Sequence, residues 1–214
     1  MNNYFASCPR GLEPLLADDI AALGGQHVKS VGGGVTFAGD WPTCYAVNLH
    51  SRLATRVLWR VAARGYAKED DIYRLALDTD WPGIFKPTQT LRVDVTAIKS
   101  PLKSLDFVTL RVKDGICDRF RRDCGNVRPS IDTRQPDVRV QIFLTENQCT
   151  LYVDTSGDPL WQRGLRQKTV EAPLKENLAA GILRLAGWQP GTPLFDPMCG
   201  SGTFLLEAVQ IAHG

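Results

Sequence analysis

The stretch that decides the fold is LFDPMCGSGTFLLEA, residues 194–208. A short apolar run leads into a loop in which Gly200 and Gly202 are separated by one residue, and an apolar segment with helical spacing follows. This pattern predicts a strand, a glycine-rich loop and a helix, the first β–α turn of a doubly wound sheet. Glycines let the backbone pass close to a ligand, and the N–H groups that begin the helix attract polar or anionic groups. The stretch therefore predicts a nucleotide-type binding loop.

Two glycines alone are weak evidence for any particular ligand. With the Asp-Pro dipeptide before them and Cys199, the loop resembles motif I of methyltransferases that bind S-adenosylmethionine. The resemblance implies that Asp196 lies near the positively charged methionine end of the cofactor and that the glycines leave room for it. The predicted cofactor-binding residues are Asp196, Pro197, Cys199, Gly200, Ser201, Gly202 and Thr203. An ordinary glycine-rich turn is the alternative, and a dinucleotide site is less well supported because Phe204 and Leu205 stand where a third glycine is expected.

Length and composition are those of a globular protein. The chain has 214 residues, 43% hydrophobic and 22% charged, which is enough for one large or two small domains. No apolar run approaches the roughly 20 residues of a membrane helix, and no basic segment with an apolar core begins the chain. The six cysteines form no C-x-x-C pair or zinc-like spacing. We therefore expect a cytoplasmic protein with reduced thiols, without a metal site and without a membrane partner.

The first part of the chain predicts a strand, a helix and a second strand. YFASC is the first strand, and residues 11–23 have apolar side chains at helical spacing until Gly24-Gly25 ends the helix. The segment SVGGGVTFAG (residues 30–39) then returns as a strand. Its glycine run is interpreted as a flexible strand entry or bulge, because no Lys-Ser/Thr follows as a phosphate loop requires.

The middle of the chain mixes helices and strands. Helices are predicted at residues 43–53, 69–76 and 104–122, and strands at 54–65, 90–98, 138–145 and 149–156. The helix 104–122 would bury Val108, Val112, Ile116 and Phe120, and the last two strands would form an antiparallel pair. After turn residues at 156–159 and the basic stretch LWQRGLRQK, Pro173 is expected to open a helix that Gly187 ends. The fold class is α+β.

The resemblance extends along the chain. RGLRQKTVEAPLKENLAAGILRLAGWQPGTPLFDPMCGSGTFLLEA (residues 163–208) looks like the entry to the catalytic domain of THUMP-containing RNA guanine-N2 methyltransferases. ASCPRGLEPLLADDIAALG and residues 132–166 are similar to their ferredoxin-like and THUMP parts. The resemblance is greatest to the bacterial large-subunit (23S) rRNA methyltransferases of the fused K/L type. It implies a ferredoxin-like part at 1–42, a THUMP RNA-binding domain at 43–155, and a linker with the start of a Rossmann-like methyltransferase domain at 156–214.

This family carries two further features beyond motif I. They are an acidic residue for the ribose hydroxyls and an N-P-P-Y or D-P-P-Y loop that holds the target base amine, and neither occurs in this sequence. We therefore expect the chain to be the RNA-binding front of a longer S-adenosylmethionine-dependent rRNA (guanine-N2) methyltransferase, without catalytic residues and inactive alone. The alternative is a stand-alone RNA-binding module whose motif I remnant is inert.

Basic residues concentrate between residues 111 and 139. A solvated basic face is one interpretation, and the THUMP resemblance favours contact with structured RNA, such as large-subunit rRNA, through its backbone or end. The predicted RNA-binding residues are Lys113, Arg119, Arg121, Arg122, Arg128 and Arg134. Trp161, Arg163 and Arg166 could touch RNA or pack in the linker. Pro173, Lys175 and Glu176 would border the cofactor pocket by resemblance, or form an ordinary solvated helix start.

Overall fold

The computed structural model of the chain describes residues 1–162 and 174–213. The chain divides into two compact units, Met1–Val57 with the residues from Thr155 onward, and Leu58–Asp154. No helix in the described part is long and apolar enough to cross a membrane. Those residues also contain no group of three or more His, Cys, Asp or Glu side chains that could hold a metal ion. The expected division between residues 42 and 43 lies inside the first unit.

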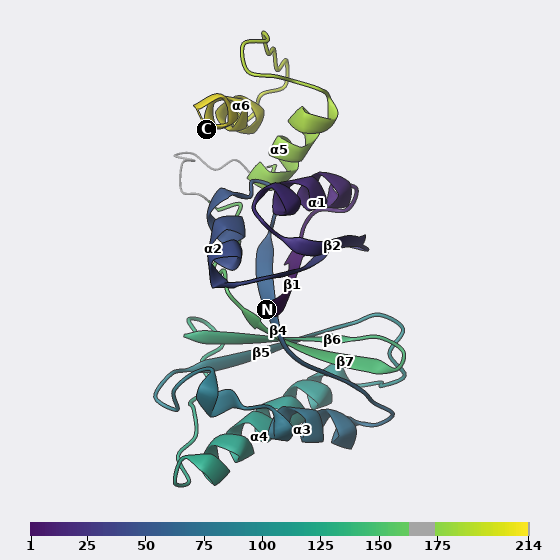
Figure 1. Cartoon of the computed structure of the whole chain (residues 1–214), viewed down its shortest axis with the longest axis vertical. Helices are drawn as coiled ribbons and strands as arrows, with labels where there is room; N and C mark the ends of the chain where they lie inside the picture. The colour runs from purple at the N-terminus through teal and green to yellow at the C-terminus, as the bar shows by residue number, and fades with distance from the viewer. Residues whose placement is uncertain (163–173, 214) are drawn as a thin grey trace. The chain divides into compact units, whose positions relative to one another are not determined.

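The first unit begins with the element order of a ferredoxin-like fold (Figure 1). The elements are β1 (Asn2–Ser7), α1 (Glu13–Ala22), β2 (Gln26–Val31), β3 (Gly34–Gly39), α2 (Trp41–His50) and the start of β4 (Arg56–Gly65). Strand β3 pairs antiparallel with both β1 and β2. Helix α1 buries Leu16 and Ile20, and the Asp40 side chain caps α2 by accepting from Thr43 N at 2.9 Å. The expected ferredoxin-like part is confirmed.

The glycine run forms a hairpin turn at Gly32 and Gly33 within the stretch expected as one strand, and Gly34 is the strand entry, because β3 begins there. Gly32 and Gly33 join β2 to β3, and Gly33 has φ +82°, a left-handed conformation that glycine adopts readily. The sequence does not predict β2 as a separate strand. Its sequence QHVKSV is largely exposed and lacks the apolar alternation that marks a half-buried strand.

Two helices complete the first unit, α5 (Glu176–Leu185) and α6 (Thr203–His213), and they pack against each other. Helix α5 also lies directly on the segment before α1, because a Cβ on Gly181 would clash with Leu12 Cδ1. Pro173, expected to open this helix, lies outside the described residues. The helix expected after the glycine loop is present as α6. The short apolar run at residues 194–195, expected as a strand, pairs with no strand of the described residues.

The second unit is a layer of four neighbouring strands, and two helices cover one of its faces (Figure 1). After β4 come α3 (Glu69–Asp78), a 3₁₀ turn η1 (Trp81–Gly83), β5 (Leu91–Ala97), α4 (Leu105–Asp123), β6 (Val138–Leu144) and β7 (Gln148–Asp154). The strand order is β4-β7-β6-β5. Strands β5 and β6 are parallel, joined through α4, while the other neighbours are antiparallel. The predicted antiparallel pair of the last two strands is confirmed.

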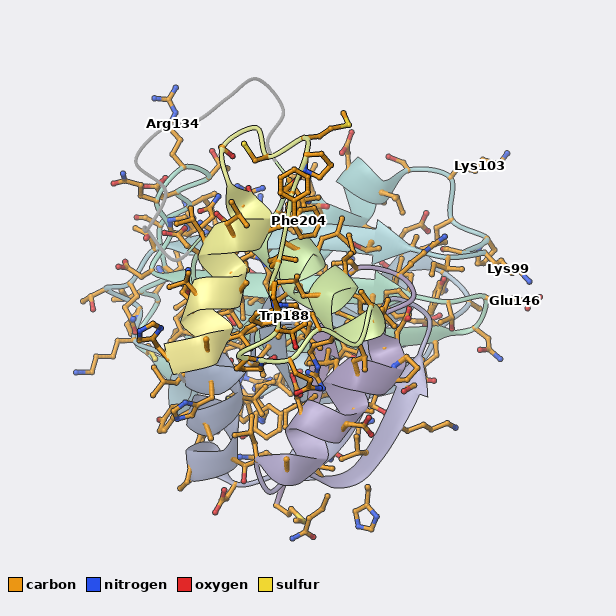
Figure 2. The ribbon with its side chains drawn as sticks, turned by 90° about the horizontal axis from the view of Figure 1, so that it is seen from above. Lys99, Lys103, Arg134, Glu146, Trp188 and Phe204 are labelled. Carbon is orange, nitrogen blue, oxygen red and sulfur yellow. The ribbon has the colours of Figure 1, made fainter. Side chains whose placement is uncertain are left out.

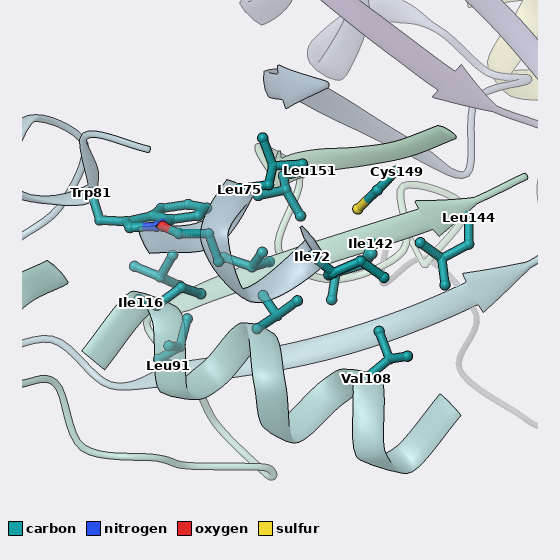
Figure 3. Packing of buried hydrophobic residues seen from close by; sticks show 14 of the residues in the cluster. Ile72, Leu75, Trp81, Leu91, Val108, Ile116, Ile142, Leu144, Cys149 and Leu151 are labelled. Atoms are coloured by element: carbon teal, nitrogen blue, oxygen red, sulfur yellow. The ribbon is translucent and has the colours of Figure 1, made fainter. Parts of the chain in front are cut away.

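The core of the second unit lies between the sheet and helices α3 and α4 (Figure 3). The predicted stripe of α4 is fully buried: Val108, Val112, Ile116 and Phe120 are all 0% exposed. Trp81 is also buried, and its indole Nε1 donates to Ala76 O at 2.7 Å, so the only polar atom of the side chain has a partner. This core fixes α4, and therefore fixes the surface on which most of the predicted RNA-binding residues lie.

Candidate cofactor loop and nucleic-acid surface

The predicted cofactor loop is a compact turn at the N-terminus of α6. The Asp196 carboxylate accepts from Met198 N at 3.0 Å, and Gly202 N donates to Cys199 O at 2.7 Å, so the segment curls back on itself. Leu206 N donates to Gly202 O, which starts the hydrogen-bond ladder of α6 directly from the loop. The first N–H groups of the helix therefore face the loop, as anion or polar-ligand binding requires.

The two glycines of the loop have the geometry for which glycine is needed. Gly200 has φ +53° and Gly202 has φ +75°. Apart from its two chain neighbours, no atom of residues 1–162 and 174–213 lies within 4 Å of a Cβ built on Gly202, so these residues leave the space above Gly202 open. Around it, Pro197 and Cys199 are exposed, whereas Thr203 is buried and Ser201 Oγ lies 3.2 Å from Thr203 Oγ1. The structure thus brings the seven predicted residues into one open turn.

A cavity lies beside the start of α5, within the first unit. It has a volume of about 610 Å³ and is lined by Cys8, Pro9, Thr55, Leu174, Lys175, Asn177 and Leu178. Lys175 Nζ lies 5.6 Å from the centroid of the Trp161 ring, a cation–π contact. Trp161 therefore packs against the residue that precedes α5. Arg163 and Arg166 lie outside the described residues.

The predicted RNA-binding residues on α4 are neutralised by neighbouring carboxylates. Arg121 pairs with Asp118 at 2.9 Å, and Arg122 pairs with Asp123 at 2.9 Å. Lys113 pairs with Asp114 at 3.1 Å. These pairs are partly exposed, so each contributes little to stability and can open when phosphates compete for the cations. Their presence means that α4 is a mixed-charge surface, less basic than its arginine content indicates.

Arg119 has a structural role. Only 16% of its side chain is exposed; Nη1 donates to Asp78 O at 3.0 Å and Nη2 lies 3.2 Å from Asp80. Its Nε also bonds Asp123. The guanidinium thus binds a terminal carbonyl of α3, where a cation is favoured. Replacing Arg119 together with Arg121 and Arg122 would therefore disturb the fold as well as the surface.

Arg128 and Arg134 belong to the loop between α4 and β6, and neither forms an ion pair within residues 1–162 and 174–213. Both are exposed. The loop itself is held in place, since Leu91 N donates to Ser130 O at 2.8 Å and Asp132 accepts from Arg134 N at 2.8 Å. Figure 2 shows Lys99 and Lys103 on the opposite side of the view from Arg134. The predicted set is therefore split between paired cations on α4 and two exposed arginines on this loop.

Three family models match consecutive parts of the sequence. They are the RlmL ferredoxin-like domain at residues 3–58, the THUMP domain at residues 66–154, and the RMKL-like methyltransferase domain at residues 163–213. The candidate loop lies in the third match and the predicted RNA-binding residues lie in the second. The chain therefore has the domain order of THUMP-containing RNA methyltransferases.

Solved structures are similar over 99% of this chain. A possible methylase from Clostridium difficile 630 has 30% sequence identity and a TM-score of 0.88, and SMU.472, crystallised with SAH, has 28% identity and a TM-score of 0.87. TrmN from Thermus thermophilus has 27% identity and a TM-score of 0.81. The match covers 55% of the first two chains and 62% of TrmN, so this chain spans little more than half of each.

Proposed function

We propose that this chain is the RNA-binding and cofactor-loop portion of an S-adenosylmethionine-dependent methyltransferase that modifies the N2 amine of guanine in large-subunit ribosomal RNA. In this proposal the THUMP domain binds structured RNA, and the loop at the N-terminus of α6 holds one side of the cofactor. The base-binding loop and the ribose-binding carboxylate come from other parts of the full-length parent. The chain alone then binds cofactor weakly or not at all.

The observation that carries the proposal is the open turn around Gly202. Left-handed backbone at Gly200 and Gly202, free space above Gly202 and the helix N-terminus that follows are together the features a cofactor loop needs. The match of residues 163–213 to a methyltransferase domain, and a similar structure crystallised with SAH, support S-adenosylmethionine as the cofactor. The choice of guanine N2 and of large-subunit rRNA is supported by the sequence resemblance.

The support for RNA as the partner is independent of the loop. Residues 66–154 match the THUMP domain, and this unit presents two exposed arginines, Arg128 and Arg134, on an ordered loop. Phosphate groups are the natural counter-ions for such side chains. The exchangeable ion pairs of Arg121 and Arg122 on α4 add further cations that RNA could recruit.

The decisive experiment is Gly202→Val in the full-length parent. Valine would carry a β-branched side chain at φ +75° and fill the space above the loop, so methyl transfer to rRNA should fall by about 100-fold or more while RNA affinity is retained. Calorimetry with S-adenosylmethionine on the parent and on the 214-residue chain gives the cofactor affinity of each. Lys29→Ala, on exposed strand β2, is the control.

Full methyl transfer by the Gly202→Val enzyme would show that the loop is not part of the cofactor site. The chain would then be an RNA-binding module with an inert loop, a function compatible with the large exposure of Phe195 and Met198, at 85% and 89%. A parent that methylates a different base, or a different class of RNA, would keep the cofactor assignment and correct only the substrate.

A further inference from the structure

The segment 51–55, between α2 and β4, contacts both helices that flank the candidate cofactor loop. Asn177 of α5 donates through Nδ2 to Leu53 O at 3.3 Å and to Thr55 Oγ1 at 3.0 Å. From the same segment, Arg52 reaches α6. The two helices are therefore tied to one short stretch of the ferredoxin-like part, 122 residues or more away in sequence.

Arg52 binds the C-terminal half of α6 at three points. Nη1 donates to Gln210 Oε1 at 2.9 Å, Nη2 donates to Gln210 O at 3.0 Å, and Nη1 lies 3.6 Å from Glu207 Oε2. Glu207 is 1% exposed, so its carboxylate is buried beside the guanidinium. The carbonyl of Gln210 is one of the last four of α6, which have no partner inside the helix. Arg52 satisfies this acceptor and places a positive charge at the negative end of the helix dipole.

The backbone around Arg52 is itself fixed. Ser51 is 1% exposed, and its Oγ accepts from Leu53 N at 3.4 Å and from Ala54 N at 3.1 Å. Leu53 and Ala54 are buried as well. The backbone that carries the Arg52 side chain is therefore held in one place. Because the guanidinium is planar and its donors are fixed relative to one another, arginine loses less side-chain freedom for each hydrogen bond than lysine does. A lysine at this position could not bond both oxygens of Gln210 in the same plane.

From this geometry we infer that Arg52 is a positioning residue for the cofactor loop, acting through α6. Helix α6 begins at Thr203, directly after Gly202, and its hydrogen-bond ladder starts from Gly202 O. When Arg52 holds the far end of α6, the N-terminal N–H groups and the loop are held against the ferredoxin-like part. The effect on cofactor binding rests on the proposed function. The restraint that Arg52 places on α6 through Gln210 and Glu207, called the clamp below, does not.

The clamp is tested by amide hydrogen exchange on the 214-residue chain. With Arg52→Ala, the amides of α6 should exchange at least about tenfold faster, because losing a charge-assisted hydrogen bond destabilises a helix on about that scale. The amides of β1 and β3 should keep their protection. Arg52→Lys should give an intermediate rate. The matched control is Arg184→Ala, which removes the pair between α5 and Asp19, at 2.5 Å, and leaves the bonds to Gln210 intact. Equal acceleration of α6 in both variants, or none in Arg52→Ala, would overturn the clamp.

The positioning role is tested in the full-length parent. Arg52→Ala should raise the Kd for S-adenosylhomocysteine and the KM for the methyl donor more than Arg184→Ala does, with kcat at saturating donor changed less and Arg52→Lys partly restoring both. Faster exchange of α6 without any change in these constants would leave Arg52 as a purely structural contact and refute the inference. A parent that binds no S-adenosylhomocysteine even without substitution would refute the proposed function instead, and the exchange result would still decide the clamp.

Discussion

Arg119 on α4 donates through Nη1 to the main-chain carbonyl of Asp78, the last residue of α3, at 3.0 Å. The same guanidinium lies 3.2 Å from the Asp80 carboxylate. One side chain therefore joins the end of α3 and the following turn to the C-terminal part of α4. Its donors satisfy a helix-terminal carbonyl, and its charge opposes the partial negative charge of that helix end.

Arg119→Ala should therefore destabilise the THUMP unit by about 1–3 kcal/mol, because the carbonyl that ends α3 loses its charged partner and a side chain that is only 16% exposed is removed. Arg121→Ala, which breaks an exposed pair on the same helix, should cost less than about 0.5 kcal/mol. Urea unfolding followed by circular dichroism measures both free energies. Equal effects of the two substitutions would contradict the structural role of Arg119.

Much of the second unit could be predicted because its signals are local. The four-residue spacing from Val108 to Phe120 predicts a helix with one buried face, and the alternation in VRVQIFLT predicts a half-buried strand. Asp118 stands three residues before Arg121, and Asp123 four after Arg119. This spacing could have indicated that the α4 cations are paired.

The features that sequence reasoning missed depend on contacts between distant residues. Strand β2 is held by its pairing with β3, and its own side chains carry no periodic signal. The bonds of Arg119 to α3 and of Arg52 to α6 join residues 41 and 158 positions apart. Nothing in the residues next to Arg52 indicates a helix-binding role, so only the three-dimensional structure could identify it.

Arg128 and Arg134 are predicted to contribute more to RNA affinity than the paired arginines of α4. The double substitution Arg128→Ala, Arg134→Ala should weaken binding of structured rRNA, and the slope of log K against log salt should decrease by about 1 for each phosphate that the variant no longer neutralises. Fluorescence polarisation at about 50 to 300 mM salt, where counter-ion release has a large effect on affinity, measures both the RNA affinity and the salt slope. Lys29→Ala should change neither quantity, and an unchanged slope in the double variant would place the RNA elsewhere.

Asp137 is predicted to contribute a pH-dependent part of the stability. Its carboxylate accepts from Thr90 N at 2.7 Å and from Thr90 Oγ1 at 2.8 Å, and the backbone N–H of Thr90 is the main cause that holds the pKa of Asp137 below its ordinary value. A lowered folded-state pKa stabilises the protein above the unfolded-state value, about 3.9, and this contribution is lost as pH falls through the folded-state pKa.

The Asp137→Asn variant should therefore lose stability relative to the unaltered chain at about pH 6, and the difference should shrink as the pH is lowered below about 4. Thermal unfolding at pH values between about 2.5 and 6 gives the difference curve. A difference that grows towards acid pH would have the wrong sign for a lowered pKa and would contradict the Thr90 contact.

The cysteine in the candidate cofactor loop should react faster with an alkylating reagent than the cysteines buried in the two cores. Burial raises the pKa of both Cys8 and Cys149 to about 12, so both thiols stay protonated at about pH 8, and little or none of either residue is exposed. Cys199 in the loop is exposed. Iodoacetamide at about pH 8 should therefore modify Cys199 first, and Cys8 and Cys149 only after the chain is unfolded in denaturant.

The carboxamidomethyl group would then stand next to Gly200, in the open space of the loop. If the loop holds S-adenosylmethionine, labelled full-length parent should lose cofactor affinity, and bound S-adenosylhomocysteine should slow the labelling of Cys199 while leaving the other thiols unchanged. Peptide mass spectrometry over a time course measures each rate, with Cys199→Ser as the variant that lacks the reactive site. Labelling of Cys199 at the same rate with and without saturating S-adenosylhomocysteine would separate this cysteine from the cofactor, because an occupied loop must restrict access to the sulfur.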